Sequence, residues 1–190
     1  MAFTHLHVHT EYSLLDASSK IKELTARAKE LGMDSLAITD HGVMYGVIDF
    51  YRAARENGIK PIIGCEMYVS PDGIDNKEKK YNHLLLLAEN DEGYHNLIKL
   101  VSIANTRGFY YKPRVDHQLL AQYSKGLICS SACLAGEVPR AITANDLEKA
   151  EESIRWHKKV FGDDYYLELQ LHKATVERAN HEAYPMQLHV

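Results

Sequence analysis

Strand-like and helix-like segments alternate along most of the chain, and this alternation limits the possible folds more than any other feature. Alternating or continuous apolar residues predict strands, and apolar residues three and four positions apart predict helices. The predicted strands cover residues 2–8, 35–39, 60–69, 83–88, 126–130 and 165–170, and the predicted helices cover residues 18–31, 46–56, 94–107, 144–161 and 173–184. Such alternation is typical of α/β proteins, in which helices cover a parallel sheet. Six candidate strands bring the prediction close to a barrel.

Histidines and an aspartate lie at the ends of the first two predicted strands, where barrels of this kind carry their chemistry. His7 and His9 point to the same face of a strand, because side chains two positions apart do so. They could bind one metal ion or two, although a lone His-x-His is more often incidental. The second strand runs into Asp40, His41 and Gly42, and the glycine permits a tight turn. His41 is a candidate ligand, and Asp40 is either a ligand or a support that fixes the tautomer of His41; the alternative is an ordinary turn.

Later segments add further candidate ligands. Glu66 follows an apolar run, where a carboxylate is costly to bury unless it is paired or bound to metal. It could bridge two metal ions or form a salt bridge. His83 opens its predicted strand, so either the boundary is displaced or the strand runs the other way. Cys133 and Asp16 are weaker candidates, because most single cysteines are inert core residues.

The donors at successive strand ends suit phosphoester hydrolysis assisted by several metal ions. Zinc, manganese and iron are all compatible with imidazole and carboxylate ligands. A net charge of −4 lacks the basic excess of chains that grip duplex DNA by themselves, so nucleic acid would be met through a small pocket or with other domains. Three cysteines without paired spacing indicate a reducing, cytoplasmic location. The longest apolar run is too short to cross a membrane, and the start shows no signal-peptide pattern.

Five segments together resemble the PHP (polymerase and histidinol phosphatase) region of bacterial DNA polymerase III alpha subunits. They are THLHVHTEYSLLDA, LAITDHGVMYGVIDFY, KPIIGCEMYV, NHLLLLAENDEGYHNLIKL and SSACLAGEVPRA. The resemblance implies a distorted seven-stranded (β/α) barrel of TIM type over residues 1–190, usually with three metal ions. It also implies a ligand set that comprises His7, His9, Asp16, His41, Glu66, His83 and Cys133.

The family also closes its site with a late Asp-x-His motif, which this sequence lacks, since no aspartate stands two residues before His189. We therefore expect a domain truncated before its last strand, without the polymerase palm and fingers and so without polymerase activity. The resemblance implies 3′–5′ exonuclease proofreading of a DNA primer end, or pyrophosphate hydrolysis. Its partners would be the rest of the alpha chain and other polymerase III holoenzyme subunits. Two alternatives remain open: an inactive scaffold that stabilises the polymerase and binds a proofreading subunit, and a free-standing histidinol-phosphate phosphatase.

Overall fold

The computed structural model describes residues 3–170, and their strands form one six-stranded sheet. The strand order is β1-β2-β3-β5-β6, with β4 also paired to β2. The bounds are β1 Ser35–Ile38, β2 Lys60–Ser70, β3 Asn82–Ala88, β4 Arg114–Asp116, β5 Leu127–Ser130 and β6 Tyr165–Tyr166. The expected α/β architecture is confirmed. Seven strands were expected in a barrel, and within residues 3–170 no pairing joins β1 to β6.

The sheet is mixed, whereas the alternation predicted a parallel one. Strands β1 and β4 run parallel to β2, but β3 runs antiparallel to both β2 and β5. Only a long connection allows parallel neighbours, and the loop between β2 and β3 contains no helix to make that crossover. The reversal explains why His83 opens its strand, because the start of β3 lies beside the end of β2.

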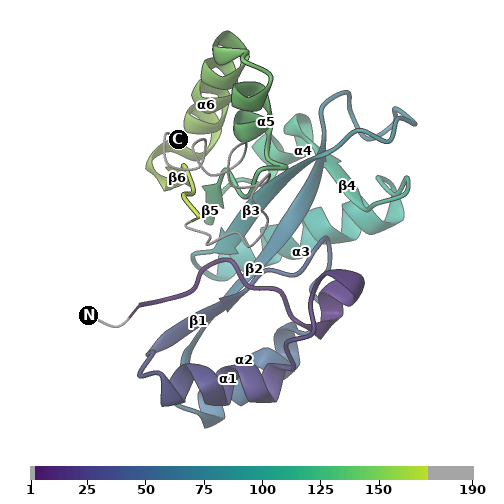
Figure 1. Cartoon of the computed structure of the whole chain (residues 1–190). Coiled ribbons are helices and arrows are strands. Elements are labelled where there is room, and N and C mark those ends of the chain that lie inside the picture. Colours follow the sequence, from purple (N-terminus) through teal and green to yellow (C-terminus); the bar gives the residue numbers. More distant parts are fainter. Residues whose placement is uncertain (1–2, 171–190) are drawn as a thin grey trace.

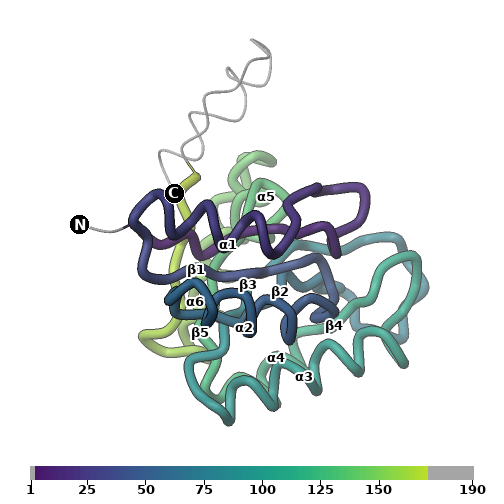
Figure 2. Tube along the Cα trace, turned by 90° about the horizontal axis from the view of Figure 1, so that it is seen from below, coloured from purple at the N-terminus to yellow at the C-terminus, as the bar shows by residue number. Residues whose placement is uncertain are grey.

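Helices cover both edges of the sheet and one of its faces. Figure 1 shows α1 and α2 beside β1, and α5 and α6 beside β5 and β6. Figure 2 shows α3 on the opposite side of the sheet from residues 3–9. No helix within residues 3–170 is long and apolar enough to cross a membrane. The bounds are α1 Ile21–Glu30, α2 Val47–Glu56, α3 Asp91–Thr106, α4 His117–Gln122, α5 Glu137–Thr143 and α6 Leu147–Phe161, with 3₁₀ helices η1 Glu11–Asp16 and η2 Gly162–Asp164.

The first predicted strand is wrong over its described residues, which form an extended segment without strand pairing. This segment lies beside β1, where the Ala37 and Thr39 N–H groups donate to the carbonyls of His5 and Val8 over 2.9 and 2.8 Å. The Val8 N–H donates instead to the Thr39 hydroxyl over 2.9 Å, which interrupts a regular ladder. We call residues 3–9 the N-terminal segment.

Other boundaries also differ from the predictions. The predicted helix 144–161 begins only at Leu147, because the Asp146 side chain caps it by accepting from the Lys149 N–H. The predicted strand 165–170 is reduced to two residues, and β4, α4 and α5 were not predicted. The predicted helix 173–184 lies outside the described residues.

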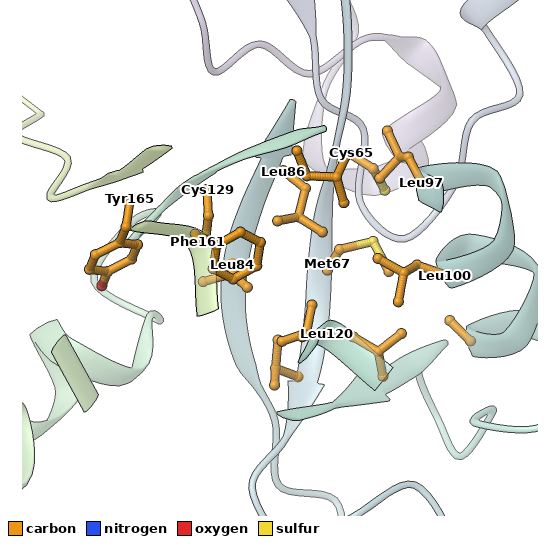
Figure 3. Close-up of a cluster of buried hydrophobic side chains, with 14 residues drawn as sticks. Cys65, Met67, Leu84, Leu86, Leu97, Leu100, Leu120, Cys129, Phe161 and Tyr165 are labelled. Carbon is orange, nitrogen blue, oxygen red and sulfur yellow. The ribbon is translucent and has the colours of Figure 1, made fainter. Parts of the chain in front are cut away.

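The main core lies between the sheet and α3. Successive residues of β2 point alternately into this core and toward the opposite face of the sheet. Cys65 and Met67 point into this core (Figure 3). Glu66 and Tyr68 therefore lie on the other face, where Tyr68 is opposite His83 in the register. The remaining labelled core residues in Figure 3 are Leu84, Leu86, Leu97, Leu100, Leu120, Cys129, Phe161 and Tyr165.

Gly64 allows β2 and β3 to lie close together, two residues before Glu66. A methyl group at this position would lie 2.6 Å from the Leu86 carbonyl oxygen and 2.6 Å from a Leu87 methyl group. Any side chain would push the two strands apart. The glycine therefore maintains the spacing on which the positions of Glu66 and His83 depend.

Candidate metal centre

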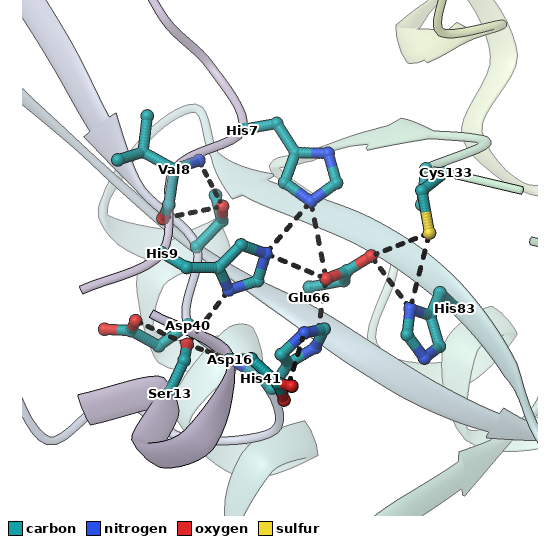
Figure 4. A network of polar contacts seen from close by, with 12 residues as sticks. His7, Val8, His9, Ser13, Asp16, Asp40, His41, Glu66, His83 and Cys133 are labelled. Carbon is teal, nitrogen blue, oxygen red and sulfur yellow. Dashed lines mark hydrogen bonds and ion pairs between the residues drawn. The ribbon is translucent and has the colours of Figure 1, made fainter. Parts of the chain in front are cut away.

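Glu66 is the centre of a group of imidazoles on the polar face of the sheet (Figure 4). Its carboxylate is 1% exposed. Oxygen Oε2 lies 3.0 Å from His9 Nε2, 3.0 Å from His41 Nδ1 and 3.4 Å from His7 Nε2, and Oε1 lies 3.1 Å from His83 Nδ1. Burial opposes ionisation of Glu66, but its contacts with the four histidines outweigh burial and hold its pKa far below the ordinary value. We call these residues the Glu66 centre.

Three different parts of the chain bring histidines to Glu66, which lies in β2. His7 and His9 come from the N-terminal segment, which β1 holds by backbone hydrogen bonds. His41 follows β1 and pairs as a parallel bridge with Glu66, and the Gly42 N–H donates to the Glu66 carbonyl over 2.9 Å. His83 reaches the same face from the antiparallel neighbour β3.

Cys133 and Asp16 lie at the edge of the Glu66 centre. The Cys133 sulfur, in the loop after β5, is 3.7 Å from Glu66 Oε1 and 3.6 Å from His83 Nδ1. Burial raises the pKa of its thiol. The Asp16 carboxylate is more exposed and lies 3.8 Å from His41 Nε2. The structure thus brings all seven ligands expected from the sequence into one group.

Asp40 lies behind these ligands and acts on His9 through Ser13. The buried Asp40 carboxylate accepts hydrogen bonds from the Thr10 N–H, the Thr10 hydroxyl and the Ser13 hydroxyl over 2.6, 2.7 and 2.7 Å. Because the Ser13 proton is used in this way, its oxygen accepts from His9 Nδ1 over 2.9 Å. No hydrogen bond joins Asp40 to the His41 ring within residues 3–170. Asp40 and Ser13 thereby place the His9 proton on Nδ1.

Glu168 holds His7 in the corresponding way, and sequence reasoning missed it. Its Oε1 lies 2.7 Å from His7 Nδ1, and its Oε2 accepts from the Ser130 hydroxyl over 2.8 Å. The alternation of Leu167, Glu168 and Leu169 suggests the wrong orientation for this position. The two leucines are exposed, whereas Glu168 is largely covered. Apolar residues of a strand normally point inward, so the pattern concealed the carboxylate.

The fixed tautomers show that the Glu66 centre fits a cation. His7 and His9 both carry a proton on Nδ1, so each Nε2 presents a lone pair or a second proton. These two Nε2 atoms are 3.3 Å apart and both approach Glu66 Oε2. Lone pairs and a carboxylate at such distances repel one another unless a positive charge lies between them.

His41 supplies a second indication of a cation site. Its buried Nδ1 is 3.0 Å from Glu66 Oε2, yet it has no aligned hydrogen-bond partner within residues 3–170. A buried nitrogen without a partner is unusual unless it binds something else. Two groups of three donors, His7 with His9 and Glu66, and His41 with Glu66 and His83, are each compact enough to hold one ion.

In the absence of a metal ion, a proton supplies the positive charge. Burial alone would lower the pKa of His7, but its hydrogen bonds to Glu168 and Glu66 outweigh burial and raise the pKa to about 9. The Glu168 carboxyl has a lowered pKa, because its bond to His7 outweighs the effect of burial. A divalent ion would replace the His7 proton.

Two DNA polymerase III alpha subunits are similar to this chain over most of its length. The DNA polymerase III subunit alpha of Borreliella burgdorferi is 51% identical over 175 residues, which cover 90% of this chain and 15% of that protein. The corresponding subunit of Chlamydia muridarum is 46% identical over 183 residues, covering 94% of this chain and 15% of that protein. The chain therefore spans about 15% of the length of these relatives.

Structural and family comparisons extend over most of the described residues. A solved amidohydrolase from Chromobacterium violaceum matches 80% of this chain and 43% of its own with a TM-score of 0.42 and 19% identity. The PHP domain family matches residues 5–172, which include all seven expected ligands as well as Glu168. The chain belongs to the PHP domain family, in the form found in DNA polymerase III alpha subunits.

Proposed function

We propose that this chain is the metal-dependent phosphoesterase domain of a replicative polymerase subunit. The observation that carries this proposal is the convergence of imidazole nitrogens on the buried carboxylate of Glu66. Two compact groups of donors share that carboxylate, so it would bridge two ions. Asp16 and Cys133 would extend the set toward a third ion. Zinc, manganese and iron all accept such nitrogen, oxygen and sulfur donors.

When bound, ions of this kind lower the pKa of water and neutralise phosphate charge. The protein residues supply orientation. Ser13 and Glu168 hold the rings of His9 and His7 so that Nε2 of each faces Glu66. Such outer partners fix the ring and raise its basicity as a ligand. Hydrogen bonds to Thr10 and Ser13 keep the Asp40 carboxylate in place behind the ligands.

We further propose that the substrate is the 3′ end of a DNA primer, removed by 3′–5′ exonuclease action, with pyrophosphate as the second candidate. The similarity to DNA polymerase III alpha subunits supports a substrate from DNA synthesis. With a net charge of −4, the domain would receive DNA from the rest of the alpha chain and other holoenzyme subunits. Three free cysteines are consistent with a cytoplasmic location.

The experiment compares substrates and variants of the 190-residue chain. A 5′-labelled oligonucleotide, pyrophosphate and histidinol phosphate are each incubated with manganese or zinc. We expect shortening of the oligonucleotide by the parent chain, and its loss in His9→Gln. His95→Gln is the matched control, because His95 is an exposed residue of α3.

Each other outcome contradicts part of the proposal. Absence of both bound metal and turnover would leave the scaffold role in place of catalysis. Faster turnover of histidinol phosphate than of the oligonucleotide would favour a small-molecule phosphatase. Turnover that persists in His9→Gln would assign the activity to another site or a contaminant.

A further inference from the structure

A second group of metal-binding side chains lies outside the Glu66 centre, where α4, α5 and α6 approach one another. His117 is the first residue of α4, Glu137 is the first residue of α5, and His157 lies in α6. One donor atom of each lies within 4.8 Å of the other two. None of these residues belongs to the ligand set expected from the sequence, and none takes part in the proposed hydrolysis.

His157 presents a ring nitrogen toward this group. The residue is 1% exposed, and its Nδ1 donates to the Ser153 carbonyl over 2.8 Å within α6. Because a carbonyl can only accept, Nδ1 carries the ring proton and Nε2 has a lone pair. Among the described residues, no hydrogen-bond donor reaches that Nε2. The lone pair of that Nε2 is therefore available to bind a metal ion.

The other two donors already have a spacing that suits zinc. His117 Nε2 and Glu137 Oε2 are 3.1 Å apart. Two ligands on a tetrahedral zinc ion, with bonds of about 2.0–2.2 Å, lie about 3.3 Å from each other. The third donor would have to move by at most about 1.5 Å to reach the same spacing. The side chains of His117 and Glu137 are 28% and 19% exposed, so they retain freedom to make this adjustment.

Aromatic rings enclose the two histidines. Trp156 meets the His117 ring edge-on with centroids 4.3 Å apart, and Tyr165 stacks on the His157 ring at 4.9 Å. The buried Tyr165 hydroxyl also has no hydrogen-bond partner within residues 3–170. These ring contacts limit rotation of the two imidazoles.

We propose that His117, Glu137 and His157 bind one zinc ion or a similar transition-metal ion. Two imidazoles and one carboxylate are a known zinc donor set, and partial exposure leaves the fourth position to water. The ion joins residues from three helices that are far apart in the sequence. It therefore attaches the α5–α6 pair to α4 and stabilises this end of the domain.

The test counts zinc ions per chain by plasma mass spectrometry after dialysis against a small excess of zinc. We expect His117→Gln and Glu137→Gln each to hold one ion fewer than the parent chain, and His95→Gln to hold the same number. Glutamine at position 117 can still donate a hydrogen bond to Glu137, so a simple His117–Glu137 hydrogen bond would survive that change. These partly exposed positions avoid the folding risk of replacing the buried His157.

Two readouts separate this proposal from the proposed function. His9→Gln should lose ions of the Glu66 centre and keep the ion at His117, whereas Glu137→Gln should keep oligonucleotide hydrolysis. Zinc should raise the melting temperature of the parent chain by more than that of Glu137→Gln. Equal zinc counts in Glu137→Gln and the parent, or crystals of the zinc-loaded chain without an anomalous peak among the three residues, would overturn the proposal. A Glu66 centre without any metal would leave the difference of one ion unchanged.

Discussion

The proton on His7 competes with a metal ion at the Glu66 centre, and its removal can be measured. Hydrogen bonds to Glu168 and Glu66 raise the pKa of His7 from 6.5 to about 9. At about 1.36 kcal/mol per pH unit, this change amounts to about 3 kcal/mol in favour of the protonated form. The raised pKa stabilises the metal-free chain fully below pH 6.5, and that stabilisation is lost as the pH rises through about 9.

Glu168→Gln removes the hydrogen-bond partner that contributes most to the raised pKa. Only Glu66 then opposes the effect of burial, so the pKa of His7 falls and a larger fraction of the ring is neutral at pH 7.5. Zinc binding at that pH should release more protons from the parent chain than from Glu168→Gln. The association constant of the parent should rise about tenfold per pH unit between pH 7 and 9, and that of the variant should rise less.

Isothermal titration calorimetry measures this proton release. Zinc is titrated into metal-free chain in two buffers with different ionisation enthalpies, and the difference in heat gives the number of protons. Glu89→Gln serves as the control, because Glu89 is exposed and follows β3 at the opposite end from His83. Equal proton release from the parent chain and Glu168→Gln would show that Glu168 does not hold a proton on His7.

Three further substitutions test the centre and its support. Glu66→Gln should lose the ions of the Glu66 centre, counted by mass spectrometry; retention of all of them would rule out Glu66 as the bridge. Ser13→Ala breaks the link between Asp40 and His9, so metal affinity should fall about 10- to 100-fold in a calorimetric titration; unchanged affinity would contradict that link. Gly64→Ala should lower the free energy of unfolding in urea by about 1–3 kcal/mol because the new methyl group overlaps β3; an unchanged midpoint would refute that steric role.

The sequence indicated which side chains gather around Glu66, because they lie at the ends of apolar segments. Glu66 and His41 stand directly after such runs. The alternation of side chains along a strand places both on the side of the sheet where His7 and His9 lie. The direction of β3 could not be derived from periodicity, since both directions give the same pattern. Only the position of His83 at the start of its segment indicated the reversal.

The supporting residues could not be predicted, for two physical reasons. Ser13 and Glu168 act through hydrogen bonds between segments far apart in the chain, and no local pattern encodes such partners. His117, Glu137 and His157 lie in three helices whose packing brings them together, so their sequence spacing carries no ligand signature. The N-terminal segment was expected as a strand, but the Thr39 hydroxyl takes the Val8 N–H that a strand would use.

The position of His7 and His9 on the N-terminal segment has a practical consequence for handling the protein. Both residues lie within the first ten positions of the sequence, outside the sheet. An affinity tag fused to Met1 would end only a few residues before His7. A polyhistidine tag would itself bind the ions intended for the Glu66 centre. Preparations made with such a tag would give misleading metal counts and rates unless the tag were removed before measurement.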